Sequence, residues 1–144
     1  MGKIKGNILN IGTFNVRGIS SILKQEQLCR DMNKYNVDIC CIQETKCKSS
    51  IDTDVNGYRL ITLPTNRMYG NGFVVSPKWK DKIHSYWKVS ERISIIKILT
   101  EKSTIKSNTI PHYRTMLTGM KLRITKQIPA DHMITIINVY APHT

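Results

Sequence analysis

The sequence predicts a mixed α/β domain of the α+β kind, with one early helix and one twisted mixed sheet as its main body. Two apolar runs, Ile8–Arg17 and Val37–Lys46, have the composition of buried strands, and each ends in polar residues. Ser20–Asn36, which lies between them, has helical periodicity. Strand-like runs follow without a second clear helix, which argues against a doubly wound fold.

The first three segments have the order of a strand–helix–strand unit, in which the two strands run parallel. Parallel strands end at the same edge of a sheet. We therefore expect Asn15 and Glu44, which end the two strands, to lie at one edge. Ligands of α/β sheets bind beyond the carboxyl ends of the strands. Gly18 suits a tight exit from the first strand, and Asn36 suits a left-handed end of the helix.

The rest of the chain predicts strands separated by polar segments. Strands are expected at Gly57–Leu63, Gly72–Ser76, Tyr86–Val89 and Arg92–Thr100. Lys46–Asn56 and Glu101–Thr118 are polar and are predicted to be loops. Met120–Ile124 and Met133–Val139 are predicted to be the two strands of a hairpin.

The charge of the chain favours a polyanionic partner. Its 144 residues suit a single domain, for which we expect residues 8–144, after a flexible basic start at residues 1–7. Twenty-two basic residues against ten acidic ones give a net charge of +12. Contacts with phosphates release counterions, so such a chain favours nucleic acid. A basic surface without a specific partner is the alternative.

The cysteines and the hydropathy indicate an intracellular protein of the nucleus or cytoplasm. Cys29, Cys40, Cys41 and Cys47 have no zinc-binding spacing and suit small core residues in a reducing compartment. No hydrophobic signal region and no apolar stretch approaching ~20 residues occurs, so we expect no membrane partner.

Three motifs then resemble a known family. FNVRG at 14–18, DICCIQETK at 38–46 and INVYAP at 137–142 resemble the endonuclease/exonuclease/phosphatase family. GNGFVVSP and SERISIIKI extend this resemblance over most of the chain. Within the family, the motif sequences are most similar to those of endonucleases of non-long-terminal-repeat retrotransposons and of craniofacial-development-like proteins derived from them.

The resemblance implies a fold, an activity and a set of site residues. The implied fold is a four-layered α/β sandwich, of which this chain would form the first half, with one sheet face left uncovered and open to self-association. Asn15, Glu44 and Tyr140 match catalytic positions, and Glu44 matches the metal ligand, implying Mg²⁺. Arg17 and Lys46 flank this edge and are candidates for contacts with nucleic acid.

The implied activity is that of a Mg²⁺-dependent phosphodiesterase, an endonuclease acting on nucleic acid, with DNA favoured over RNA. The family's GDFN and SDH motifs are absent from this sequence, so the isolated chain is expected to be incomplete and inactive. A non-enzymatic, basic nucleic-acid-binding remnant of a retroelement protein is the alternative. A small-molecule phosphatase of the same family is a weaker one.

Each site residue also has an ordinary structural interpretation. Glu44 could pair with Lys46, Asn15 could satisfy a loop backbone, and Tyr140 could pack at the end of a strand. Arg17 and Lys46 could be solvated surface residues. Trp79, Trp87 and Tyr69 could stack on bases, although aromatic residues more often pack in the core.

Overall fold

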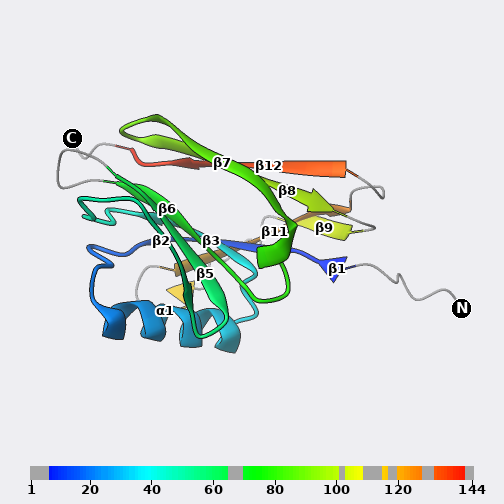
Figure 1. Cartoon of the computed structure of the whole chain (residues 1–144). Coiled ribbons are helices and arrows are strands. Elements are labelled where there is room, and N and C mark those ends of the chain that lie inside the picture. Colours follow the sequence, from blue (N-terminus) through cyan, green and yellow to red (C-terminus); the bar gives the residue numbers. More distant parts are fainter. Residues whose placement is uncertain are drawn as a thin grey trace, which may run out of the picture.

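The computed structural model describes residues 7–64, 70–100, 103–108, 115–116, 120–127 and 132–141. Within these residues, helix α1, a large mixed sheet and a three-stranded sheet form successive layers (Figure 1). This is the mixed α/β fold that the sequence predicts. Of the predicted flexible start, residues 1–6 lie outside the described residues, and Asn7 lies in strand β1.

The helix is α1 (Ile22–Lys34). The strands are β1 (Asn7–Ile8), β2 (Asn10–Asn15), β3 (Ile39–Gln43), β4 (Ile51–Val55), β5 (Tyr58–Leu63), β6 (Asn71–Val75), β7 (Ile83–Ser90), β8 (Ile93–Thr100), β9 (Ser103–Asn108), β10 (Thr115–Met116), β11 (Met120–Gln127) and β12 (His132–Val139). A short 3₁₀ turn at Lys80–Lys82 precedes β7.

The larger sheet has the strand order β1-β9-β11-β2-β3-β6-β5-β4, with β10 paired to β11. Strands β2 and β3 are parallel, in a register that sets Asn15 opposite Gln43. Helix α1 connects them, which confirms the predicted strand–helix–strand unit. Both strands therefore end at the same edge of the sheet.

Helix α1 begins after Ser21, whose side chain makes no capping hydrogen bond. Its buried residues include Leu28 and Met32, which the periodicity predicts on one face. Asn36 follows the helix with φ 56°, the predicted left-handed end. No helix among the described residues is long and apolar enough to cross a membrane.

Two cores lie on opposite faces of the larger sheet. One is formed between the sheet and α1, and it includes Cys40 and Met32. The other lies between the two sheets, and it includes Cys41, Phe73 and Trp79. Adjacent residues of β3 thus point to opposite faces, as strand geometry requires. All four cysteines are free and buried, as the sequence predicts for core residues.

The prediction of a hairpin between the last two strands is wrong. Strand β11 pairs with β2 and β9 in the larger sheet, whereas β12 pairs with β8 in the smaller one. Alternation of apolar residues identifies a strand but does not choose its partner. In β12 the inward side chains Ile134 and Ile136 are buried between the sheets, and that burial places the strand in the second sheet.

Two of the predicted loops contain strands. Lys46–Asn56 contains β4, and Glu101–Thr118 contains β9 and β10. Among the described strands, β4 pairs only with β5 at the sheet edge, where polar side chains remain exposed. Its Asp52 accepts hydrogen bonds from Arg59 and Tyr86. Strand β9 gains its hydrogen bonds from β1 and β11, partners distant in sequence that local composition does not reveal.

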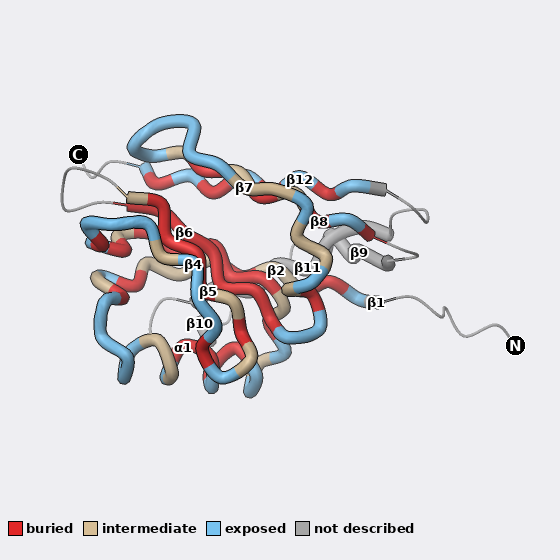
Figure 2. The backbone as a smooth tube through the Cα atoms, in the orientation of Figure 1, coloured by how far each residue is buried: buried red, intermediate tan, exposed pale blue. Residues whose placement is uncertain are grey.

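The face expected to be uncovered is instead covered. Residues of β8 and β12 pack over Ile39, Phe73 and Val75 of the larger sheet (Figure 2). Most of the large exposed apolar side chains among the described residues lie on the outer side of the smaller sheet, where alternate residues of its strands face away from the core. This surface, the outer face, includes Trp87, Val89, Leu99, Met133, Ile137 and Val139.

A buried amide joins the two sheets. Asn138 of β12 is 1% exposed, and its Nδ2 donates to the carbonyls of Ile42 and Gly72, both at 2.9 Å. Its Oδ1 accepts a hydrogen bond of 2.9 Å from Nε2 of Gln43. Asn71 adds a hydrogen bond from Nδ2 to the Asn138 carbonyl at 3.4 Å. These bonds hold β12 against the ends of β3 and β6.

We expect Asn138→Ala to lower the free energy of unfolding by about 2–4 kcal/mol, because it removes three buried hydrogen bonds, two donated to the Ile42 and Gly72 carbonyls and one accepted from Gln43. Urea unfolding measures this change. Thr135→Ala, at an exposed position of the same strand, is the matched control and should change stability by less than about 0.5 kcal/mol. Equal effects of the two substitutions would show that the hydrogen bonds of the Asn138 side chain do not contribute to stability.

Candidate active site at the carboxyl edge of β2 and β3

The chain segments that follow β2 and β3 remain paired beyond the ends of the strands. The amide of Val16 donates to the Gln43 carbonyl at 3.0 Å, and the amide of Gly18 donates to the Glu44 carbonyl at 2.7 Å. A further bond of 3.1 Å runs from the Ile19 amide to the Thr45 carbonyl. The two segments therefore leave the sheet together, and their side chains gather at one edge.

Asn15 and Glu44 meet at this edge. Asn15 Nδ2 donates a hydrogen bond to Glu44 Oε2, and Asn15 Oδ1 accepts one of 3.2 Å from the Arg17 amide. The amide is thus oriented by the backbone with its donor facing the carboxylate. This geometry confirms the predicted proximity of the two residues. The predicted alternative for Glu44, a salt bridge to Lys46, is not among the ion pairs of the described residues.

Three non-glycine residues at this edge have left-handed backbones. Arg17, Glu44 and Lys46 have φ values of 50°, 55° and 54°, and Gly18 lies beside them at 99°. For a residue other than glycine, asparagine or aspartate, this conformation costs about 1–2 kcal/mol. Strain of this kind is kept where the surrounding structure enforces it, and it clusters at functional sites. The edge is therefore held in a shape that its residues would not adopt alone.

Helix α1 supports the strained segment after β2. Lys24 Nζ donates to the carbonyls of Val16, Arg17 and Gly18 at 3.3, 3.1 and 2.9 Å. Gln25 Nε2 donates to the Ile19 carbonyl at 2.9 Å. Lys24 is one of the bases close to this edge in sequence, and its ammonium group is engaged with the backbone of the protein.

Arg17 and Lys46, each two positions after a member of the Asn15–Glu44 pair, remain exposed. A Cβ atom added to Gly18 would lie 3.9 Å from Cδ of Lys46, so the lysine stem crosses close to the Gly18 backbone. Two exposed cations thus follow the members of the Asn15–Glu44 pair closely in the sequence. This arrangement can attract a phosphate toward a carboxylate that would otherwise repel it.

Gln43 lies directly beneath this pair. It is buried, and its Nε2 contacts Thr13 Oγ1, the Cys41 carbonyl and Asn138 Oδ1 at 2.9, 3.1 and 2.9 Å. Its side chain therefore points between the sheets and fixes the end of β3. This packing ties the end of β3 to β12 directly before Glu44.

Tyr140 follows β12 at the same end of the sheets. Its backbone amide donates to the Arg92 carbonyl at 2.8 Å, and the same carbonyl accepts a bond of 2.8 Å from Nδ2 of Asn71. Asn71 is in register with Gln43. The tyrosine is 7% exposed, so it is packed more deeply than a strand-end residue that faces open solvent. A catalytic role for its hydroxyl stays a prediction.

The aromatic residues considered for stacking on bases differ in burial. Trp79 is fully buried in the core between the sheets, which excludes it from stacking on bases. Trp87 lies on the outer face at 39% exposure, with Lys97 Nζ 5.6 Å from its ring centroid. Tyr69 lies outside the described residues.

Sequence reasoning missed Asn71 and Asn138 as supports of the site. Asn138 shares its strand face with Ile134 and Ile136, so its parity alone predicts a buried amide that needs partners. That signal was available in the sequence. Asn71 precedes Gly72, and an Asn-Gly pair is typical of turns, which hid its place in a central strand.

The described residues supply little for a metal ion. No group of three or more His, Cys, Asp or Glu side chains lies close enough together among them to hold one. Glu44 is half-buried, and its Oε1 has no hydrogen-bond partner in the described part of the chain. One free carboxylate oxygen beside an amide is compatible with Mg²⁺, which commonly takes one or two protein carboxylates and keeps several waters.

Comparison with known proteins places this geometry in a family. The sequence profile of the endonuclease/exonuclease/phosphatase family matches residues 12–117, and no curated protein matches the chain. An AP endonuclease structure from Leishmania major matches 93% of the chain at 16% identity with a TM-score of 0.51. One from Archaeoglobus fulgidus matches 63% at 24% identity with a TM-score of 0.43. The chain spans 40% and 37% of the lengths of these structures.

The Leishmania match agrees with the fold described above, a helix on a mixed sheet that packs on a second sheet. The family profile covers most of the sequence, including Asn15 and Glu44. The chain therefore belongs to the endonuclease/exonuclease/phosphatase family.

Proposed function

We propose that this chain forms the amino-terminal part of a Mg²⁺-dependent phosphodiesterase domain, an endonuclease that acts on nucleic acid. The hydrogen bond between Asn15 and Glu44 is the observation that carries this proposal. It brings a carboxylate and an amide to the ligand-binding edge of a parallel strand pair, and exposed Arg17 and Lys46 belong to the segments that leave this edge. A phosphodiester brought there would meet groups suited to its charge.

Glu44 is the residue that would hold the metal ion, with the Asn15 amide keeping the carboxylate in place. A divalent ion at this position would stabilise negative charge on phosphate oxygens and on the leaving oxygen. Arg17 and Lys46 would orient the nucleic acid by its phosphates. Tyr140, at the same end of the sheets, is the proposed hydroxyl donor to the phosphate.

We further propose that residues 8–144 are an incomplete domain and are inactive alone. Phosphodiester hydrolysis needs a general base to activate water as well as a metal site. The GDFN and SDH motifs that would supply these groups do not occur in the sequence.

The alternative is a basic nucleic-acid-binding remnant without catalysis. The net charge of +12 and the exposed Arg17 and Lys46 would support binding without a complete active site. An origin from a retroelement, suggested by the wording of the motifs, suits both proposals, and both place the protein in the nucleus or cytoplasm. Metal binding at Glu44 separates them.

We expect the purified chain to bind Mn²⁺, used as a paramagnetic substitute for Mg²⁺, at Glu44 and yet to leave supercoiled plasmid DNA intact. NMR should detect Mn²⁺ broadening of the Asn15 side-chain amide signal, and Glu44→Gln should abolish that broadening because it removes the charged ligand. Glu26→Gln, the same chemical change on α1, should preserve it.

Two outcomes would overturn parts of this proposal. Broadening that persists in Glu44→Gln would exclude Glu44 as the metal ligand and favour the non-enzymatic alternative. Nicking of the plasmid by the wild-type chain with Mg²⁺, abolished by Glu44→Gln, would support the site but refute the incompleteness of the domain.

The chain should bind DNA without sequence preference and with affinity that falls as salt rises, because counterion release drives phosphate contacts. Arg17→Ala and Lys46→Ala should each reduce the slope of log K against log salt by about 0.9 on duplex DNA. Lys34→Ala, on the exposed side of α1, is the control. Fluorescence anisotropy across a salt series measures the slopes. Unchanged slopes for all three variants would exclude this edge as the contact surface.

The outer face should promote self-association, because several large apolar side chains on one sheet face exceed what single exposed residues explain. Sedimentation velocity should detect dimers or larger species at micromolar concentration, and Ile137→Lys should shift the chain to monomer. Leu23→Lys, the same kind of change at an exposed position of α1, serves as the control. A wild-type chain that remains monomeric would refute this expectation.

A further inference from the structure

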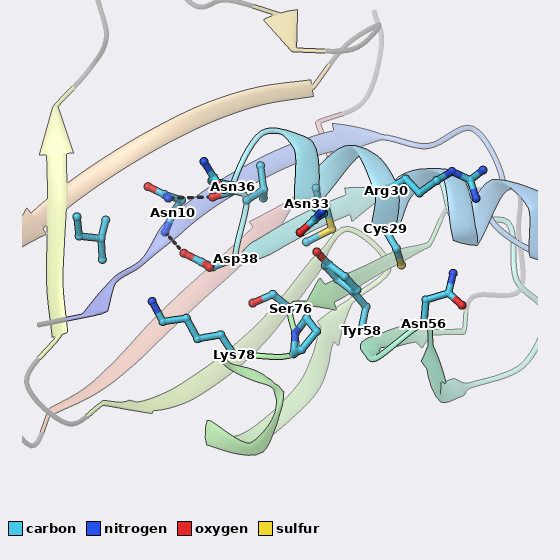
Figure 3. A pocket seen from close by; sticks show the side chains of 14 residues that line it. Asn10, Cys29, Arg30, Asn33, Asn36, Asp38, Asn56, Tyr58, Ser76 and Lys78 are labelled. Atoms are coloured by element: carbon cyan, nitrogen blue, oxygen red, sulfur yellow. Dashed lines mark hydrogen bonds between the residues drawn. The ribbon is translucent and has the colours of Figure 1, made fainter.

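A second polar cavity lies at the opposite end of β3 from Glu44. Its volume is about 740 Å³, within the range of small-molecule sites. It opens where the carboxyl end of α1, the start of β3 and the segment after β6 meet (Figure 3). Neither Asn15, Glu44 nor Tyr140 lines it, so it is separate from the proposed active site.

The carboxylate in this cavity is held rigidly. Asp38 Oδ2 accepts a hydrogen bond of 2.8 Å from the Asn10 amide, and the Asp38 backbone bonds to Asn10 and Ser76 at 2.8 and 2.7 Å. Asn10 Nδ2 in turn donates to the Asn36 carbonyl at 2.8 Å. Burial raises the pKa of the Asp38 carboxyl, while the Asn10 hydrogen bond and the Lys78 charge oppose that shift. The carboxylate keeps lone pairs free for a ligand.

Ser76 gives an independent sign of a ligand. It is only 6% exposed and lines the cavity, and its hydroxyl has no hydrogen-bond partner among the described residues. Leaving a buried polar group unpaired is unfavourable, so such groups usually have a partner in the functional state. In Figure 3 the hydroxyl lies beside the space bordered by Asp38 and Lys78.

Asp38 and Lys78 border the cavity without forming an ion pair with each other. The Lys78 charge nevertheless acts on the Asp38 carboxyl, so the two groups are close but not in contact. A carboxylate accepts from donors, and an ammonium donates to an acceptor. The pair therefore suits a ligand edge that carries donors and an acceptor side by side.

We propose that this cavity binds a guanine base, with Asp38 accepting from its N1–H and N2 amino group and Lys78 donating to its O6. The choice of a nucleobase rests on the proposed function, because a nucleic-acid substrate would supply it. Guanine offers two adjacent donors next to an acceptor. Adenine and cytosine each have a single donor group on this edge, and uracil and thymine have a single donor between two acceptors. The match is therefore specific for guanine.

The remaining lining suits a flat ring with polar edges. Apolar parts of Cys29, Met32, Val37 and Pro77 contribute to the wall of the cavity. They can pack against the faces of a base, while the Ser76 hydroxyl and the amides of Asn10 and Asn36 remain near its edges. Guanine could enter as a free nucleotide or as a base of a single strand, and both sources share this edge chemistry.

The test is calorimetric titration of the whole 144-residue chain, without divalent metal, with guanosine and adenosine monophosphates. The guanine nucleotide should bind at least about tenfold more tightly, because a charge-assisted hydrogen-bond pair is worth more than 1.4 kcal/mol. Asp38→Asn should lower that affinity about tenfold or more. Ser76→Ala removes a hydroxyl without a partner, so it should fold normally and weaken binding by a few fold.

Lys78→Gln should also weaken guanine binding, whereas Lys97→Gln, an equal loss of charge outside the cavity, should not. Chemical shifts of the Asn10 and Asn36 side-chain amides should move on titration. Equal affinity for the two nucleotides, or unchanged affinity in Asp38→Asn, Ser76→Ala and Lys78→Gln, would overturn the proposal. If Asp38→Asn does not fold, the other two variants decide.

Two further measurements distinguish a free nucleotide from a base of a strand, and the guanine cavity from the proposed active site. An oligothymidine strand with one guanine that binds with the same dependence on Ser76 and Lys78 identifies a strand, and binding of the mononucleotide alone identifies a free nucleotide. Glu44→Gln should leave guanine binding unchanged. Guanine binding lost in Glu44→Gln would place the nucleotide at the active edge and refute the second site, while failed Mn²⁺ binding at Glu44 would leave the guanine result intact.

Discussion

The parallel pairing of β2 with β3 is the constraint on which the site depends. It aligns the ends of two strands that are joined through a whole helix, and it continues past them as backbone hydrogen bonds as far as Ile19 and Thr45. Without it, Asn15 and Glu44 would have no reason to meet, since 29 positions separate them. The helix between the strands also supplies Lys24, which holds the turning segment by three carbonyls. One topological unit thus provides both the groups and their support.

The second sheet is attached by amides as well as by apolar packing. Asn138 contacts β3 and β6 through backbone carbonyls and Gln43 through its side chain, so it fixes register where apolar contacts alone would allow sliding. Asn71 extends this network to the Arg92 carbonyl, which also receives the Tyr140 amide. The last strand therefore ends at a defined place relative to the carboxyl edge of β3.

The sequence pattern within short segments predicted the elements that short segments determine. The β2–α1–β3 unit, the buried cysteines and the left-handed Asn36 follow from periodicity and from the preferences of single residues. Pairing between distant strands does not. The polar strand β9 and the placement of β12 in the second sheet depend on partners and burial that a window of sequence cannot reveal. At the site, the ends of the strands predicted that Asn15 and Glu44 meet. The roles of Lys24 and Asn71 rest on hydrogen bonds to backbone carbonyls that the sequence does not reveal.

The left-handed backbones at Arg17, Glu44 and Lys46 also bear on how the protein can change. Glycine or asparagine would occupy these positions with less strain, so substitutions that remove the charges would tend to raise stability. Under selection for folding alone, the charged residues at this edge would then be replaced before residues of the core. A lineage in which the three charged residues persist would be one in which binding or catalysis, and not folding, maintains them.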